Sequence, residues 1–222
     1  MAAALGTLGF LSHLSVPESY VRKPVRESVS FLSVLRKDRV LSVALVGFLF
    51  GVGLAAASSF VAPFAYEAGL SPVSSYYVAY SFAAILTRIV GGRFSDRVGE
   101  SRIIPMALGL TGGGLLLLAF LSGSPTLIVS GLLTGCGHGF LFPSLNALAI
   151  RDEPGEVRGR ITGVFTGSID AGVFLGSVAL GYVGQWAGFR SLFLAAGAAV
   201  LSGLAVFRLR NGGLKPSPSS WR

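Results

Sequence analysis

Residues 88–102 read Arg-Ile-Val-Gly-Gly-Arg-Phe-Ser-Asp-Arg-Val-Gly-Glu-Ser-Arg, a short run of glycines and opposite charges. This stretch separates two long apolar segments. The segment before it, 40–87, carries one charged residue, Glu67, and the segment after it, 103–150, carries none. Ionised side chains are costly in hydrocarbon, so a connector with this many charges cannot lie there. We therefore expect it at a membrane face, where it turns the chain back.

The composition is that of a helical membrane protein. Only 13% of the 222 residues are charged and 52% are hydrophobic, with a mean hydropathy of +0.70, whereas about a quarter of a soluble domain is charged. The 31 glycines would let membrane helices approach closely. Residues 40–65 lack the polar–apolar alternation of a membrane β-barrel. The sequence predicts an all-α polytopic bundle.

Several function classes are excluded by the residues present. The net charge of +8 comes from basic residues in separate short loops, which the positive-inside rule explains without nucleic acid. Cys136 is the only cysteine, so a disulfide framework and a thiolate metal cluster are both excluded. No nucleotide-binding loop, Ser-His-Asp set or metal-ligand spacing occurs. We predict no enzyme activity, no cofactor and no metal site.

The apolar segments divide the chain into four parts. Residues 1–16 are apolar but too short for a span of about 20 residues, and we interpret them as the tail of a helix whose beginning is missing. Residues 17–39 form a basic linker, and 208–222 a tail expected to be disordered. The part between them, 40–207, contains six predicted spans: 40–66, 73–92, 103–121, 126–150, 161–183 and 191–207.

Basic residues mark one side of the predicted bundle. Sixteen Lys and Arg fall in the linker, the two charged connectors and the tail, against Arg190 alone on the other side. Because such residues stay in the cytoplasm, both termini are predicted to be cytoplasmic, in a plasma (inner) membrane. The six spans form two three-span units of opposite orientation, the inverted repeat of many secondary transporters.

Residues 92–99, Gly-Arg-Phe-Ser-Asp-Arg-Val-Gly, resemble the loop motif Gly-x-Leu-Ala-Asp-Arg-x-Gly-Arg-Lys of the major facilitator superfamily. Arg88 precedes the motif, as in the drug- and sugar-efflux branches. Residues 137–146 and then Arg158, Gly159 and Gly163 are also similar to that branch. The resemblance covers 40–207 and only the second half of the twelve-span family. Glu100 and Ser101 depart from the pattern, which has Arg-Lys there.

The resemblance implies a conformational latch on the cytoplasmic side, formed by Arg88, Gly92, Asp96, Arg97 and Gly99. A carboxylate at a helix end can accept hydrogen bonds from a neighbouring helix N-terminus and pair with arginine. The alternative is a solvated loop that only fixes topology. The role of Arg88 also has an alternative, because its side chain could instead extend to the membrane surface.

Asp170 is the sharpest single candidate. It lies nine residues into the span 161–183, about 13 Å deep, where a carboxylate costs at least about 2.5 kcal/mol. We therefore expect it to face a cavity or a partner, on a polar helix face that it shares with Thr162, Thr166 and Ser177. It is predicted to couple protons or bind a substrate cation. The alternative is a structural carboxylate bonded to a neighbouring helix.

Two further polar residues lie in the span 126–150. His138 could relay protons or contact substrate, because histidine titrates near physiological pH, and Asn146 is grouped with it. A hydrogen-bonded packing histidine is the alternative. Tyr77 and Tyr80 could line a cavity or belong to an interfacial belt, and Phe50 could stack on a substrate or face lipid.

These observations predict a secondary transporter of the major facilitator type, a proton-driven antiporter that exports a small organic molecule. Its partners would be the lipid bilayer, protons and that substrate. The alternative is that the chain is a truncated or isolated half, which needs an N-terminal half or a second copy and does not transport alone. The small-x3-small glycine pairs at 131 and 135, 163 and 167, and 172 and 176 predict close helix packing.

Overall fold

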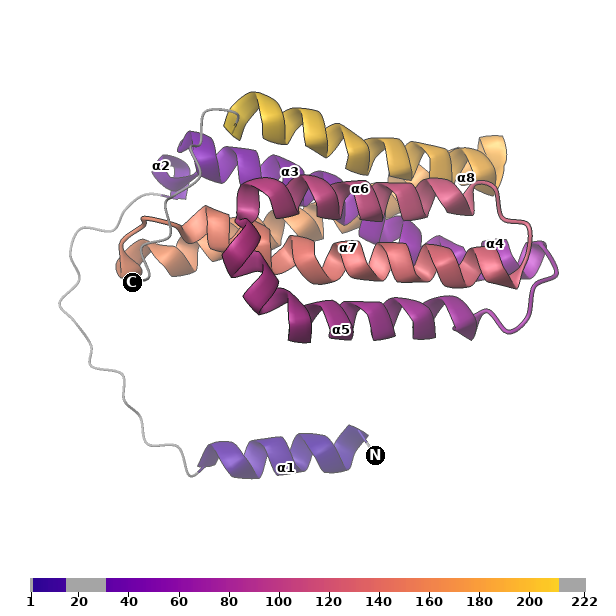
Figure 1. Ribbon diagram of the computed structural model, residues 1–222, viewed down its shortest axis with the longest axis horizontal. Coiled ribbons are helices and arrows are strands. Elements are labelled where there is room, and N and C mark those ends of the chain that lie inside the picture. Colours follow the sequence, from indigo (N-terminus) through magenta and orange to yellow (C-terminus); the bar gives the residue numbers. More distant parts are fainter. Residues whose placement is uncertain (1, 15–30, 212–222) are drawn as a thin grey trace.

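The computed structural model describes residues 2–14 and 31–211, with side-chain detail for 6–12, 33–89 and 98–210. Every regular element in these ranges is a helix (Figure 1). In chain order the elements are α1 Ala2–Leu14, α2 Phe31–Leu35, α3 Asp38–Ala55, the π-helix η1 Ala56–Phe60, α4 Val61–Glu67, α5 Ser74–Val98, α6 Glu100–Leu118, α7 Ser124–Ile150 and α8 Gly155–Asn211. The all-α prediction is confirmed.

The first span is continuous from Asp38 to Glu67 but widens to π geometry over Ala56–Phe60. Pro63 accounts for this local change. Proline has no backbone N–H, and its ring clashes with the carbonyl four residues earlier, which here belongs to Ser59. A π-turn relieves that clash without ending the helix, as π-bulges inside α-helices do.

The charged connectors are shorter than predicted because most of their residues continue the flanking helices. α5 runs through the glycine-rich motif to Val98, and α6 begins at Glu100. Only Gly99 interrupts the helical backbone between α5 and α6, with φ 81°, a conformation that glycine adopts without strain. In the second connector α8 already begins at Gly155. Helices can extend past the hydrocarbon because their backbone hydrogen bonds are internal while their charges reach water.

Six segments of the bundle are long enough to cross a membrane. Four helical stretches qualify by length and composition within the described residues, the last of them 155–210. That stretch is broken at Gly188, with φ 79° and ψ 168°. Its 56 residues would measure about 84 Å as one helix, against a hydrocarbon thickness of about 30 Å, so it is long enough to cross twice. α5 has 25 residues and runs alongside α7.

The first span of each triplet packs against the other triplet. α3, the first span of one triplet, packs along α8, and α7, the first span of the other, packs along α5. A Cβ on Gly172 of α8 would lie 2.1 Å from the carbonyl oxygen of Phe48, so the helices touch backbone to backbone. The third spans meet each other where Gly112 of α6 contacts Leu201 of α8. This arrangement fits the predicted inverted repeat.

The N-terminal part lies apart from the bundle. α1 is drawn away from the other helices (Figure 1), and its apolar side chains Leu8, Phe10 and Leu11 are exposed. Its helical form agrees with the apolar character of 1–16. α2 lies within the predicted basic linker 17–39, whereas 15–30 fall outside the described residues. The first residues of the predicted tail, 208–211, are helical because α8 continues to Asn211, and 212–222 fall outside the described residues.

Candidate functional site

A row of glycines on α7 positions the aromatic residues of α5. Gly131, Gly135 and Gly139 are four residues apart and therefore share one face of the helix. A Cβ on Gly131 would lie 2.5 Å from the carbonyl oxygen of Tyr76, and one on Gly135 would lie 2.2 Å from that of Tyr80. The predicted packing role of this pair is confirmed. The contact fixes the position of both tyrosines along the axis of α7.

Two polar pairs connect α5 to α7 in the middle of the bundle. The hydroxyl of Tyr80 is hydrogen-bonded to Nδ1 of His138, and the hydroxyl of Tyr76 lies 3.0 Å from Oγ1 of Thr134. Thr134 donates its own proton to the carbonyl of Ser130, so Tyr76 is the donor to Thr134. His138 also meets the edge of Phe50 from α3, with ring centroids 5.2 Å apart.

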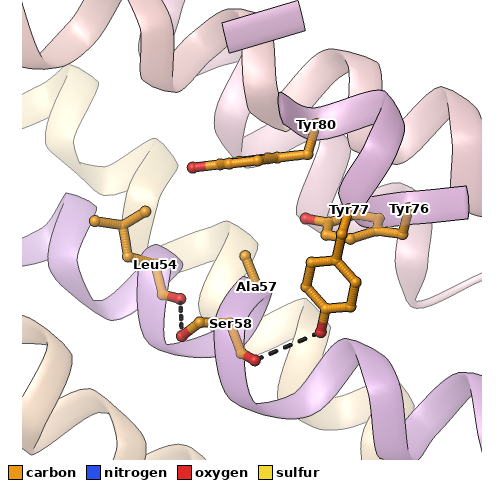
Figure 2. A pocket seen from close by; sticks show the side chains of 6 residues that line it. All are labelled: Leu54, Ala57, Ser58, Tyr76, Tyr77 and Tyr80. Carbon is orange, nitrogen blue, oxygen red and sulfur yellow. Dashed lines mark hydrogen bonds between the residues drawn. The ribbon is translucent and has the colours of Figure 1, made fainter. Parts of the chain in front are cut away.

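A cavity of about 110 Å³ adjoins these pairs, between the first span and α5. Leu54, Ala57 and Ser58 form one wall, and the three tyrosines Tyr76, Tyr77 and Tyr80 form the other (Figure 2). The hydroxyl of Tyr77 reaches the carbonyl oxygen of Ser58 at 3.5 Å. That carbonyl belongs to the π-helix, so the irregular backbone forms part of the cavity wall.

Arg88 is exposed and lies well before the end of α5. It is ten residues from the end of α5, about 15 Å, because the connector is helical. No carboxylate among the side chains the structure describes forms an ion pair with it. Its two predicted roles, in the latch or with its side chain extended to the membrane surface, stay predictions.

Asp170 and Asn146 lie outside this cluster. Asp170 is exposed on α8, fifteen residues after Gly155 and so about 22 Å along the helix. Within the described part of the chain it has no hydrogen bond or ion pair, with His138 or any other residue. Asn146 accepts a hydrogen bond of 3.1 Å from Thr162, which ties α7 to α8. The structure thus separates Asn146 from His138, with which the sequence analysis grouped it, and places Asp170 apart from both.

Ion pairs collect at the end of the bundle where the basic connectors meet. Lys37 pairs with Glu153, Arg39 with Asp152 and Arg151 with Glu100. The linker and both connectors therefore lie at the same end, as the charge count predicts. Glu100, where the sequence departs from the family motif, forms an ion pair with Arg151.

The predicted latch is largely outside this description. Gly92, Asp96 and Arg97 belong to the part of α5 whose side chains the structure does not describe, and only Gly99 and Arg88 are fully placed. The residues that sequence reasoning missed are Tyr76, Thr134 and the backbone of Ser58. Thr134 belongs to the polar spacing of α7 that contains His138, which is a usable signal, whereas nothing local marks the partner of Tyr76.

Comparison with known proteins gives a consistent result. Residues 43–222 match the family model described as Major Facilitator Superfamily. An uncharacterised MFS-type transporter of Salmonella typhimurium is 30% identical over 160 residues, which are 72% of this chain and 41% of that protein. An uncharacterised MFS-type transporter of Pseudomonas aeruginosa is 28% identical over 91% of this chain and 49% of its own length.

A solved structure shares the fold. The crystal structure of a peptide transporter in complex with sulfate superposes with a TM-score of 0.70 at 23% identity, over 86% of this chain and 44% of that one. The chain thus spans less than half the length of these proteins. With its helical membrane bundle and the match over most of its length, the chain belongs to the Major Facilitator Superfamily.

Proposed function

We propose that this chain forms the six-span half of a secondary transporter that exports a small organic molecule in exchange for protons. The observation that carries the proposal is the cavity beside Tyr80 and His138. It combines an aromatic wall with hydrogen-bonding groups at the middle of a membrane bundle, where polar side chains mark substrate or ion pathways. Membership of a transporter family supports the same conclusion.

Asp170 is the proposed proton carrier. A carboxylate about 22 Å along α8 has no partner among the described residues, and its exposed side faces away from this bundle. In a complete transporter that side would face the rest of the protein or the pathway. His138 and Asn146 are proposed as polar groups on the substrate side, and Asp96 with Arg97 as the cytoplasmic latch.

A second candidate is that the chain does not transport alone. Two observations favour it. The chain spans less than half of its relatives, and α8 exposes Gly163 and Gly167, where an added Cβ would meet nothing within 4 Å. Small residues of this spacing support close contact with another helix. The face that they share with Asp170 is suited to an N-terminal half or a second copy.

Proteoliposomes containing a trapped pH indicator would test both candidates. A panel of organic anions, cations and neutral compounds is added, and proton movement coupled to each is recorded. We expect Asp170→Asn to lower coupled proton flux at least about tenfold, while Asp152→Asn, at the basic end, leaves it unchanged. Equal flux in the two variants would refute the role of Asp170. Flux that appears only after adding the part of the Pseudomonas aeruginosa relative that this chain does not match would establish the second candidate.

A further inference from the structure

We infer that the cavity between the first span and α5 binds an uncharged molecule with one planar ring and an O–H or N–H group, such as a phenol. This inference names the substrate class for the proposed transport function and rests on it. The ring would lie between the Tyr80 ring and the apolar side chains of Leu54 and Ala57. Its polar group would donate a hydrogen bond to an oxygen atom of the cavity wall.

The lack of charge in the cavity wall supplies the first argument. The six residues that the structure describes around the cavity are apolar, hydroxyl-bearing or phenolic, and none of these types is ionised at neutral pH. Ala57 lies ten residues before the end of the first span at Glu67, about 15 Å, so the cavity lies at membrane depth. An ion held there without a counter-ion has a large desolvation cost. The wall is therefore suited to an uncharged ligand.

The arrangement of the rings supplies the second argument. Figure 2 shows the Tyr80 ring across the cavity from Leu54 and Ala57. Tyr76 and Tyr80 stack with ring centroids 6.2 Å apart, and Tyr76 meets Tyr77 edge to face at 5.2 Å. Aromatic rings prefer these two geometries, so a flat ligand ring beside Tyr80 would extend the cluster.

The size of the cavity limits the ligand to one ring. Its volume of about 110 Å³ is of the same order as an engineered apolar cavity of roughly 150 Å³ that binds benzene. A single six-membered ring fits a space of this size.

The hydroxyl groups of the wall supply the third argument. Tyr76 and Tyr80 bond through their hydroxyls to side chains of α7, Tyr76 as the donor. Tyr77 donates to the carbonyl oxygen of Ser58, and the Ser58 hydroxyl donates to that of Leu54 at 2.8 Å. A hydroxyl whose proton is in use can still accept a hydrogen bond. The wall therefore offers oxygen acceptors, and a ligand that brings its own donor is matched to them.

Four probes of similar size test the inference: para-fluorophenol, para-fluorotoluene, para-fluorobenzylammonium and para-fluorobenzoate. The first is a neutral donor, the second is neutral without a donor, and the other two are a cation and an anion. Binding to the full chain in lipid nanodiscs is measured by fluorine NMR. Each affinity is referred to the probe concentration dissolved in the lipid of empty nanodiscs, because the cavity lies at membrane depth.

The neutral donor should bind best. We expect para-fluorophenol to bind about fivefold more tightly than para-fluorotoluene, which is the effect of one neutral hydrogen bond. It should bind at least about tenfold more tightly than either charged probe, because the wall supplies no counter-ion.

Variants then locate the site. Ala57→Leu fills the cavity, and we expect it to weaken para-fluorophenol binding at least about tenfold. Ala179→Leu makes the same change at an exposed position of α8 that does not line the cavity, and it should bind the probe like the unchanged chain. Circular dichroism checks that each variant is folded, and the comparison of the four probes on the unchanged chain needs no variant.

Other outcomes overturn the inference. They are tightest binding of a charged probe, equal binding of para-fluorophenol and para-fluorotoluene, no binding above empty nanodiscs, or para-fluorophenol binding that a folded Ala57→Leu leaves intact. The assay contains no gradient, so it is independent of transport. If a charged probe binds best, the inferred ligand class fails and the transport proposal stands. If para-fluorophenol binds as expected but proteoliposomes show no coupled flux, the transport proposal fails and the site stands.

Discussion

Gly135→Ala should destabilise the bundle by forcing α5 and α7 apart. An added Cβ would lie 2.2 Å from the carbonyl oxygen of Tyr80, whereas real Cβ contacts essentially never fall below 3.0 Å. The two helices would have to separate locally by almost 1 Å. The obstacle is backbone, so no side chain can rotate to relieve it. Overpacking of this kind costs about 1–3 kcal/mol of the free energy of unfolding.

Gly113→Ala is the matched control, because a Cβ at Gly113 on α6 would meet nothing within 4 Å. Replacing glycine by alanine inside a helix is by itself favourable by about 0.5–1 kcal/mol, so this variant should be neutral or slightly more stable. Thermal unfolding of both variants in detergent, followed by circular dichroism, gives the comparison. Equal unfolding temperatures for Gly135→Ala and Gly113→Ala would refute the close contact of α5 with α7.

The same variant tests the site. The carbonyl that Gly135 contacts belongs to Tyr80, whose hydroxyl bonds to His138. Movement of α5 by almost 1 Å should weaken that hydrogen bond and, with it, the coupled proton flux proposed for this site. Gly113→Ala should leave that flux unchanged. Unchanged flux in a clearly destabilised Gly135→Ala would mean that the site does not depend on the position of α5 against α7.

Two further predictions concern polar contacts. Thr134→Val leaves the hydroxyl of Tyr76, a residue only 1% exposed, without its acceptor, which should cost about 1–3 kcal/mol of the free energy of unfolding. Thr134→Ser should cost less, and equal unfolding temperatures for the two variants would exclude the hydrogen bond as the cause. Glu100→Gln and Arg151→Gln should show a coupling of at most about 1 kcal/mol in a double-mutant cycle of unfolding, because the pair is partly exposed. High salt should reduce this coupling, and zero coupling at low salt would contradict the ion pair.

The form of the charged connectors shows where sequence reasoning reached its limit. The charges in 88–102 correctly indicated a membrane face, since the ion pair of Glu100 with Arg151 brings both connectors to one end. The motif did not reveal that α5 continues to Val98. Charge marks where a chain leaves hydrocarbon, but a helix can continue past that point.

The candidate site divides in a similar way. His138 was predicted because a polar residue in an apolar span is itself a signal. Its contact with Tyr80 joins residues 58 positions apart, and no local pattern predicts such a pair. For Tyr77 and Tyr80 the sequence left the cavity and the interfacial belt equally open, and the structure places both in the cavity wall.

The sequence by itself determined the helical membrane class and the end at which the basic residues gather. Those properties follow from the cost of each side chain in lipid, which a residue carries wherever its neighbours lie. Only the tertiary structure decided that α3 packs on α8 and α5 on α7, and hence that Tyr80 and His138 form a pair while Asp170 is exposed. Helix pairing in a membrane depends on the fit of small and large side chains between distant segments, and that fit exists only in the folded chain.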